Sequence, residues 1–526
     1  MGANKKRLAA VFAVGGLVAA ACGGDDGGGG TAASVDDGVR EGVESQIGGS
    51  TATTGGEAKP HPTTMEGWEA LWAEERAAMV AHITENGWGK SADGTTLTGP
   101  EGYTVDLSAC PAEWSDTEGV TDTGIKLGWP SVLSGPQGDF AGWPLGGTAM
   151  LEHYSAEGYF TDAEGQTRNV TVEIRDDGYD TAKTIPLIDE LIDSERVFGT
   201  ATGISPGGLN TYDKLNARCI PQFIHTGHPA WGDPVNHPWT TNMILSYSTE
   251  AVIWGAFIEQ NIDEWGGQAK VAGLVMSNDF GKAYNDSLRA YIEESPRAAD
   301  IEYVTESIEP SAPTIKDQMT TLAAQQPDVF IAMTTGTSCT QAITEAAENG
   351  MKEEAKALFQ PSVCKSSSFI GKDKVGGDGS LADGWWIVGG GLKDFNAEAF
   401  DDDAWVVWAR EVLTGAGYDY RTSANYTQGV ALGWQLAQAL KVAGELPGGV
   451  TRSNFNVALR TMDMTNPALV EGVKFNMNGN ADAYIIEGAD LSQWSSADQR
   501  WEVQTIVELS GESDNCAWDP AAGVCG

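Results

Sequence analysis

Short apolar runs rich in β-branched residues alternate with segments of helical periodicity from Gly124 onward. Each apolar run has the length of a buried strand, and in each helical segment apolar residues recur every three or four positions. The pattern predicts strands at 125–129, 170–176, 197–202, 220–225, 269–277, 301–308 and 328–334. It predicts helices at about 144–154, 181–192, 206–217, 251–261, 282–294, 314–325 and 339–350.

Strands that alternate with helices of this length form parallel sheets with helices on both faces. The alternation runs through the chain twice, and the second run starts near residue 251. We therefore expect an α/β protein with two Rossmann-like, doubly wound lobes. In such sheets a ligand binds outside the carboxyl ends of the strands, where the strand order reverses.

A further helix is predicted before the first lobe. The stretch from Thr63 to Ile83 opens with the capping-box pattern Thr63-x-x-Glu66 and continues with Trp68, Leu71, Trp72 and Met79 at helical spacing. We interpret residues 61–122 as an N-terminal helical extension and its aromatic stripe as a packing face.

The first residues have the layout of an export signal. Lys5-Lys6-Arg7 form a positive region, Leu8–Ala21 form a short apolar region, and small residues lead into Cys22. The stretch VAAACGG resembles the lipobox of bacterial lipoproteins, in which Cys22 becomes the lipid-modified N-terminus; an ordinary signal peptide is the alternative. Residues 23–60, rich in Gly, Thr, Ser and Asp, are predicted to be a flexible tether.

The charge excludes one class of partner. The 526-residue chain has a formal net charge of −42. It therefore lacks the excess of Lys and Arg that a protein needs to neutralise nucleic-acid phosphates. A very soluble exported protein is the simplest explanation, and we expect a monomer.

The six cysteines after Cys22 suggest three disulfides in an exported chain. About fifteen connectivities are possible in principle. Proximity in the sequence favours Cys516–Cys525 and Cys339–Cys364, which leaves Cys110–Cys219. No cysteine pair has metal-type spacing, so we expect neither a metal nor a cofactor.

Gly203-Ile204-Ser205-Pro206-Gly207 has the G-x-S-x-G spacing of a serine-hydrolase nucleophile elbow. That elbow uses the N–H of the residue after the serine as an oxyanion donor, and proline has none. We therefore interpret Ser205 as a helix N-cap, Pro206 as the first helical residue, and the following N–H groups as a cradle for a polar ligand. The sequence predicts no enzymatic activity.

The order and spacing of several stretches resemble the type I periplasmic binding proteins, in particular the leucine/isoleucine/valine-binding receptors of ABC transporters. These stretches are IKLGWPSVLSGPQGDFAG, VTVEIRDDGYDTAKTIPLIDELI, VFGTATGISPG, ARCIPQFIHTGHPAWGDP and VAGLVMSNDFGKAY. The resemblance implies lobe 1 at 123–245 and 374–470, lobe 2 at 246–373 and 471–510, and a disulfide-closed tail at 511–526.

The resemblance also implies ligand-binding positions. Two aromatic residues lie where the family covers the ligand, and the others lie in loops that bind its polar groups. The positions are Phe140, Thr202, Gly203, Ser205, Gly227, His228, Phe280 and Thr335. The resemblance also implies an acidic residue that binds the ammonium group of the ligand. Its position falls near Ser362–Cys364, where this chain has no carboxylate.

An unpaired buried ammonium costs several kcal/mol, so this gap disfavours a standard α-amino acid unless another acid such as Asp279 reaches in. We expect an extracytoplasmic lipoprotein, anchored to the cell membrane, that binds an amino-acid-like, amide or carboxylate solute and delivers it to an ABC permease. The alternative is a ligand-sensing or cell-envelope interaction protein of the same fold without a transporter.

Overall fold

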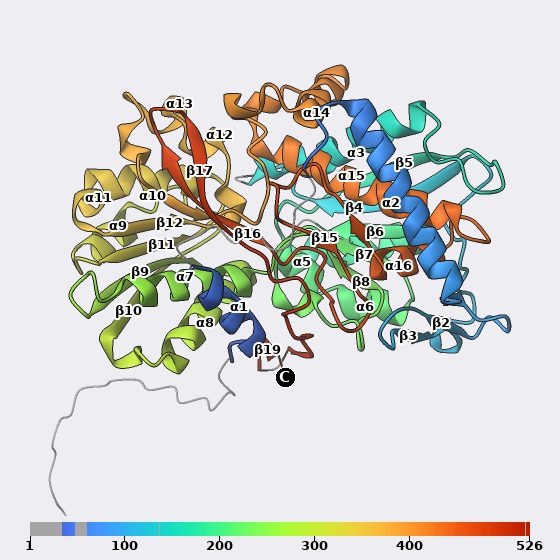
Figure 1. Ribbon diagram of the computed structural model, residues 1–526, viewed down its shortest axis with the longest axis horizontal. Coiled ribbons are helices and arrows are strands. Elements are labelled where there is room, and N and C mark those ends of the chain that lie inside the picture. The colour runs from blue at the N-terminus through green and yellow to red at the C-terminus, as the bar shows by residue number, and fades with distance from the viewer. Residues whose placement is uncertain (1–33, 48–59, 136, 203, 521, 526) are drawn as a thin grey trace, which may run out of the picture.

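The computed structural model describes residues 34–47, 60–135, 137–202, 204–520 and 522–525. Two α/β lobes lie side by side, each with a central sheet flanked by helices (Figure 1). The expected fold class is confirmed.

Lobe 1 is built on a parallel sheet of five strands in the order β5-β4-β6-β7-β8. Its strands are β4 (Gly124–Ser131), β5 (Asn169–Asp176), β6 (Gly199–Thr202), β7 (Gln222–Ile224) and β8 (Thr240–Asn242). Its helices are α3 (Gly142–Ala156), α4 (Thr181–Asp189), α5 (Ser205–Leu209), α6 (Tyr212–Ala217), α14 (Ala404–Gly415), α15 (Ala424–Glu445) and α16 (Arg452–Arg460).

Lobe 2 contains a seven-stranded sheet in the order β10-β9-β11-β12-β13-β16-β17, in which the last two strands run antiparallel to their neighbours. The strands are β9 (Ala269–Met276), β10 (Ile301–Ile308), β11 (Val329–Met333), β12 (Ala357–Gln360), β13 (Trp386–Val388), β16 (Ala489–Ser495) and β17 (Arg500–Val507). The helices are α7 (Tyr247–Asn261), α8 (Asp279–Glu294), α9 (Lys316–Ala323), α10 (Thr337–Glu348), α11 (Met351–Glu354), α12 (Ser367–Ile370) and α13 (Lys372–Val375).

Smaller elements surround the lobes. The extension consists of α2 (Met65–Glu85) and a sheet of β1 (Gly89–Lys90), β2 (Thr96–Thr98) and β3 (Thr104–Asp106). The hairpins β14–β15 (Asp463–Met464, Phe475–Asn476) and β18–β19 (Trp518–Asp519, Val524–Cys525) follow near the C-terminus. The N-cap of α2 is Thr64, which accepts a hydrogen bond from Gly67 N at 3.1 Å, and not Thr63 as expected.

Helices α3 and α15 pack closely because glycines line their contact. A Cβ added at Gly146 would lie 2.2 Å from the carbonyl oxygen of Tyr426, and one added at Gly429 would lie 2.3 Å from the carbonyl oxygen of Trp143. These glycines bring the two backbones together and fix α15, from the second half of the chain, on lobe 1.

Two segments differ from the expected organisation. Helix α1 (Asp37–Ile47) lies within the predicted flexible tether and packs on α7, with Val39 and Val43 buried. Strand β13 falls in the 374–470 range expected in lobe 1, yet it pairs with β12 and β16 of the larger sheet. The chain therefore stays in lobe 2 for longer than the sequence indicated.

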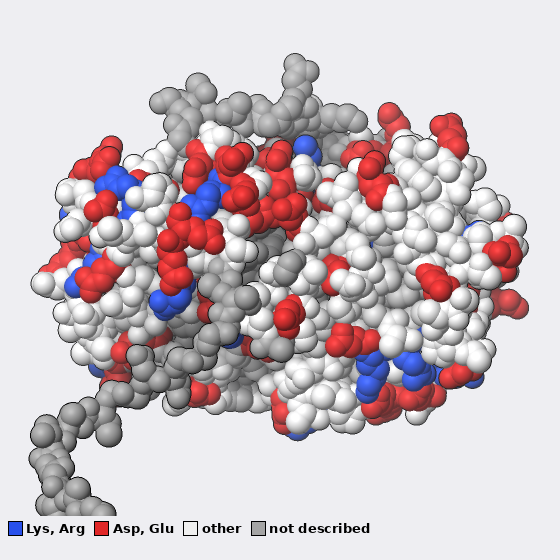
Figure 2. Space-filling model, turned by 90° about the horizontal axis from the view of Figure 1, so that it is seen from below, with Lys and Arg blue, Asp and Glu red and all other residues white. Residues whose placement is uncertain are grey.

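The structure contains the two disulfides favoured by proximity, Cys339–Cys364 and Cys516–Cys525, and the remaining pair, Cys110–Cys219. Acidic side chains are spread over the face seen in Figure 2 and outnumber the basic ones there. Among the described residues, no helix has both the length and the apolar character needed to cross a bilayer. The expected lipidation site, Cys22, lies outside the described residues.

Candidate functional site: the cleft between the lobes

The strand order reverses beside β4 in lobe 1 and beside β9 in lobe 2. Ligands bind at such switch points in doubly wound sheets. Phe140 follows β4, and Ser205 is the first residue of the helix after β6. Phe280 lies in the first turn of the helix after β9, and Thr335 follows β11. The topology therefore brings these four predicted residues to the two switch points.

Tyr247, in the first turn of α7, connects several predicted residues. Its ring centroid lies 5.1 Å from that of Phe280, and its backbone N–H donates to Gly227 O at 2.6 Å. Burial raises the pKa of the Tyr247 hydroxyl, whereas the Gly227 backbone and, to a smaller extent, the nearby Ser205 hydroxyl lower it. The Ser205 hydroxyl makes no hydrogen bond of ordinary geometry with a described residue. Sequence reasoning missed Tyr247, although its place directly after the expected lobe boundary at 245 was a usable signal.

Further contacts cross the outer part of the cleft. Asn278 Nδ2 donates to the Tyr179 hydroxyl at 3.1 Å, and Gln137 Nε2 donates to Pro310 O at 2.6 Å. These pairs border a cavity of about 360 Å³, which we call the outer cavity; its lining also includes Thr181, Pro206, Asp279 and Ser311. The two lobes are thus in contact across the cleft.

An aromatic row leads from this cavity into lobe 1. Phe140 stacks on Trp143 with ring centroids 4.6 Å apart, and Trp143 meets His225 edge-on at 5.4 Å. Phe140 also lies 6.1 Å from Tyr179. These rings are buried, with 3% of the surface of Phe140 and 6% of that of Trp143 exposed.

The buried polar atoms without a hydrogen-bond partner among the described residues include Ser131 Oγ, His225 Nδ1 and Thr334 Oγ1. These three residues follow or end β4, β7 and β11. Burial lowers the pKa of His225 to about 4, so its imidazole is neutral at pH 7. Buried polar groups are normally paired, and the described residues supply these three atoms with no partner.

The sequence has no carboxylate near Ser362–Cys364, but the fold places the carboxyl group of Glu250, from α7, beside Ser362. Its Oε2 accepts from Ser362 N at 2.9 Å, and its Oε1 accepts from Ser362 Oγ at 2.5 Å and from the Tyr284 hydroxyl at 2.9 Å. Burial raises the pKa of Glu250 to about 8, which outweighs the lowering effect of these hydrogen bonds. Glu250 is therefore mainly a neutral acid at pH 7, and its oxygens already accept hydrogen bonds from Ser362 and Tyr284.

The other predicted residues are placed differently. Ser205 is the first residue of α5 and Ile204 occupies the N-cap, so the expected Ser205 cap is wrong. Thr202 is fully buried and accepts from Gln222 Nε2 at 3.3 Å within its own lobe. His228 lines a separate cavity described below. Gly203 lies outside the described residues.

A family model of periplasmic binding proteins matches residues 124–497. The chain belongs to this family. The expected family is confirmed, and with it the assignment to solute-binding proteins.

Solved structures share the fold. A branched-chain amino acid ABC transporter protein from Thermus thermophilus with bound valine is 17% identical, with a TM-score of 0.61, and the match covers 73% of this chain and 96% of that one. A fatty acid ABC transporter substrate-binding protein from Thermomonospora curvata is 16% identical, with a TM-score of 0.58 and coverages of 77% and 96%.

A solute-binding protein from Rhodopseudomonas palustris BisB5 in complex with 3,4-dihydroxybenzoic acid is 18% identical, with a TM-score of 0.56 and coverages of 76% and 99%. At these identities the similarity shows the fold alone. A comparison with curated proteins finds no significant sequence match.

Proposed function

We propose that this periplasmic binding protein is the extracytoplasmic receptor of an ABC importer. It closes its two lobes on a small solute and presents the closed form to a permease. It is anchored to the membrane through Cys22, acts as a monomer and catalyses no reaction. The observation that carries the proposal is the set of contacts that joins the two switch points across the cleft.

A solute stabilises the closed form of such a receptor only if it contacts both lobes. Ser131 and His225 supply polar atoms from lobe 1, and Thr334 supplies one from lobe 2. Phe140 and Phe280, with 3% and 5% of their surface exposed, bring an apolar side chain from each lobe. A solute that fits between them has a flat or branched apolar part and polar groups at its edge.

The state of Glu250 narrows the solute class. Because its carboxyl is hydrogen-bonded and mainly neutral at pH 7, it provides little charge to balance an ammonium. An amide or carboxylate solute without an ammonium therefore fits the site better than a standard α-amino acid. Two of the similar structures hold valine and 3,4-dihydroxybenzoic acid, and the second of these compounds lacks an ammonium.

Thermal-shift and calorimetric titrations of the purified protein test the proposal. The panel is leucine and valine, their deaminated acids and amides, and hydroxybenzoates. A ligand at a hundred times its Kd adds about 2.7 kcal/mol of stability. We expect hits only among compounds without an ammonium, with Phe280→Ala weakening binding and the exposed Val235→Ala leaving it unchanged. No hit in the panel would contradict the solute class, and equal binding by the Phe280→Ala variant would contradict the site.

A further inference from the structure

In the described part of the chain, three segments cross between the lobes before the last strand of lobe 2. They join β8 to α7, β13 to α14, and β15 to β16, and we call the last of them, residues 477–488, the third crossing. It starts on lobe 1, where the ring centroid of Phe475 in β15 lies 5.9 Å from that of Trp434 in α15. Strand β17 ends in lobe 2, and the tail at 511–526 follows it. The tail lies outside the 124–497 range that matches the family, so the function proposed above does not account for it.

The first part of the tail runs back along the third crossing. Near the lobe 2 end of the crossing, Glu487 Oε2 accepts a hydrogen bond from Gly511 N at 2.5 Å, and its Oε1 accepts one from Ser513 N at 3.2 Å. Nearer to lobe 1, Asn515 Nδ2 donates to Asn480 O at 2.6 Å. The tail and the third crossing therefore lie side by side in opposite directions, and hydrogen bonds join them at both ends.

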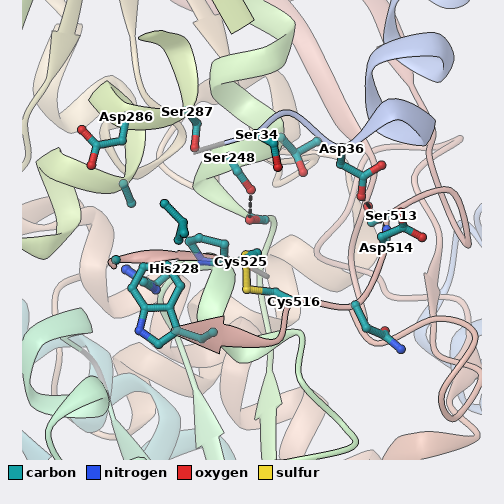
Figure 3. Close-up of a pocket in the computed structure, with 18 of the residues that line it drawn as sticks. Ser34, Asp36, His228, Ser248, Asp286, Ser287, Ser513, Asp514, Cys516 and Cys525 are labelled. Carbon is teal, nitrogen blue, oxygen red and sulfur yellow. Dashed lines mark hydrogen bonds between the residues drawn. A yellow bond between two sulfur atoms is a disulfide. The ribbon is translucent and has the colours of Figure 1, made fainter. Parts of the chain in front are cut away.

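The end of the tail is fixed on lobe 1. Cys516 N donates to Gly232 O at 2.7 Å, and the Trp518 ring meets the His228 ring edge-on with centroids 4.7 Å apart. The Cys516–Cys525 disulfide joins the β18–β19 hairpin to the start of this contact, and Figure 3 shows both cysteines and His228 around one cavity. The hairpin therefore holds the tail against the loop that follows β7.

The residues that lead into the tail are fixed on lobe 2. The side chain of Gln46, in α1, pairs with the backbone of Glu508, directly after β17. Its Nε2 donates to Glu508 O at 3.0 Å, and its Oε1 accepts from Glu508 N at 2.9 Å. Helix α1 itself packs on lobe 2, where the Arg40 guanidinium lies 4.2 Å from the centre of the Tyr291 ring. The tail is therefore a further connection between the lobes, bonded to lobe 2 before its start and to lobe 1 at its end.

The tail also spans a cavity of about 560 Å³ (Figure 3). One wall of this cavity comes from α7 and α8 of lobe 2 and includes Lys282, and another comes from lobe 1 and includes His228. Ser513, Cys516 and Trp518 of the tail line the same space. The walls belong to different lobes, and the tail joins them.

We propose that the tail is a brace that stiffens the third crossing and holds the two lobes in the arrangement seen here when no solute is bound. A crossing segment allows lobes to rotate because its backbone dihedral angles absorb the motion. A second segment bonded to it at both ends must break its own hydrogen bonds, or the Trp518–His228 contact, before the crossing can bend. The brace thus raises the fraction of the free receptor in which the two lobes are already together. A larger binding-competent fraction gives a tighter apparent affinity for a solute that contacts both lobes.

The test uses the full purified protein without solute. Small-angle scattering measures the radius of gyration, and amide hydrogen exchange measures opening of the third crossing. In Trp518→Ala, and in Cys516→Ser/Cys525→Ser, we expect a larger radius of gyration and at least fivefold faster exchange of hydrogen-bonded amides in 477–488. The matched control is Trp265→Ala, because Trp265 is also half-buried but packs on Phe257 within lobe 2, with ring centroids 6.3 Å apart. The control should change neither quantity.

A milder variant guards against loss of folding in the other two. Asn515→Ala removes only the hydrogen bond to Asn480 and should accelerate exchange in the same segment to a smaller extent. The proposal is overturned if the folded tail variants scatter like the natural protein. It is also overturned if exchange accelerates in the tail while the amides of 477–488 keep their protection, because the tail is then an appendage without effect on the crossing. Since no solute is present, these outcomes do not depend on the solute class proposed above.

Discussion

A hydrogen bond of 3.1 Å joins the side-chain amide of Asn278, in lobe 2, to the phenol oxygen of Tyr179, in lobe 1. Each partner is fixed within its own lobe. Asp177 Oδ1 accepts from Tyr179 N at 3.0 Å in a tight turn, and Asn278 Oδ1 caps α8 by accepting from Gly281 N at 3.2 Å. Neither side chain can follow the other if the lobes separate, so this bond reports closure.

Tyr179→Phe should shift the lobes toward an open arrangement. The substitution keeps the ring near Phe140 and removes only the acceptor, so the loss is that of one hydrogen bond, about 0.5–1.5 kcal/mol. We expect a larger radius of gyration without solute in small-angle scattering, and a solute affinity reduced by about two- to tenfold. Tyr418→Phe, on a tyrosine that stacks with Tyr426 within lobe 1, is the control. Identical scattering and affinity for the two variants would show that the bond does not stabilise closure.

The buried carboxyl of Glu250 makes stability depend on pH. Its pKa is about 8 in the folded protein and 4.5 when unperturbed, so the folded state binds the proton more tightly. This contribution is complete below about pH 4.5 and is lost as the pH rises through about 8, with each pKa unit corresponding to about 1.4 kcal/mol. We expect the free energy of unfolding, measured in denaturant from pH 5 to 9, to fall over that range.

Glu250→Gln should reduce this decline, because the amide keeps the size of the neutral acid and cannot ionise. The slope should not vanish, since burial also raises the pKa values of Glu487 and Asp482. A Glu250→Gln variant with the same pH dependence as the natural protein would show that Glu250 is not responsible.

The parallel sheets were predictable because their central strands are apolar runs bounded by turn residues. Strands β4, β9 and β11 follow from this signal alone. The short strands β12 and β13 did not, because four and three residues carry too little pattern to separate a strand from a loop. Helix α1 was predictable in principle: Val35, Val39, Val43 and Ile47 recur every four residues, but the surrounding Gly, Asp and Ser indicated a tether.

The chemistry of the cleft was less predictable than its location. The family resemblance placed Phe140, Ser205 and Phe280 in loops that the topology brings to the switch points. The role of Glu250 could not be predicted, because this residue of α7 contacts Ser362, which follows β12 and lies 112 residues away in the sequence. Glu250 directly precedes the predicted helix 251–261, an acidic residue at such a place is usually exposed, and only the three-dimensional packing shows that this one is not.

Removing the Cys110–Cys219 disulfide should loosen one part of the N-terminal extension. The bridge joins residues 109 positions apart in the sequence. In the chain-entropy model, closing a loop of this length stabilises the folded state by up to about 4–5 kcal/mol. Helix α2 has its own contact with lobe 1, where Trp72 lies 5.3 Å from Trp434. In a Cys110→Ser/Cys219→Ser variant, amide hydrogen exchange should therefore accelerate in β2–β3 and around Trp114, and not in α2.

The control is Cys516→Ser/Cys525→Ser, which opens the tail at the other end of the chain. It should leave exchange in β2–β3 unchanged. Equal protection of these amides in both variants would mean that other contacts, such as the Tyr103 hydroxyl donating to Pro238 O at 2.8 Å, hold the extension without the bridge.

Two glycine substitutions should have opposite effects on stability. In Gly146→Ala the new Cβ would lie 2.2 Å from the Tyr426 carbonyl oxygen, a backbone atom that moves only if α3 and α15 separate. Overpacking of this kind costs about 1–3 kcal/mol and occasionally more. Gly415, at the end of α14, has nothing within 4 Å of the added Cβ, so Gly415→Ala should stabilise the protein by about 0.5–1 kcal/mol. Denaturant unfolding of both variants measures the difference, and a stable Gly146→Ala protein would show that the α3–α15 contact tolerates separation.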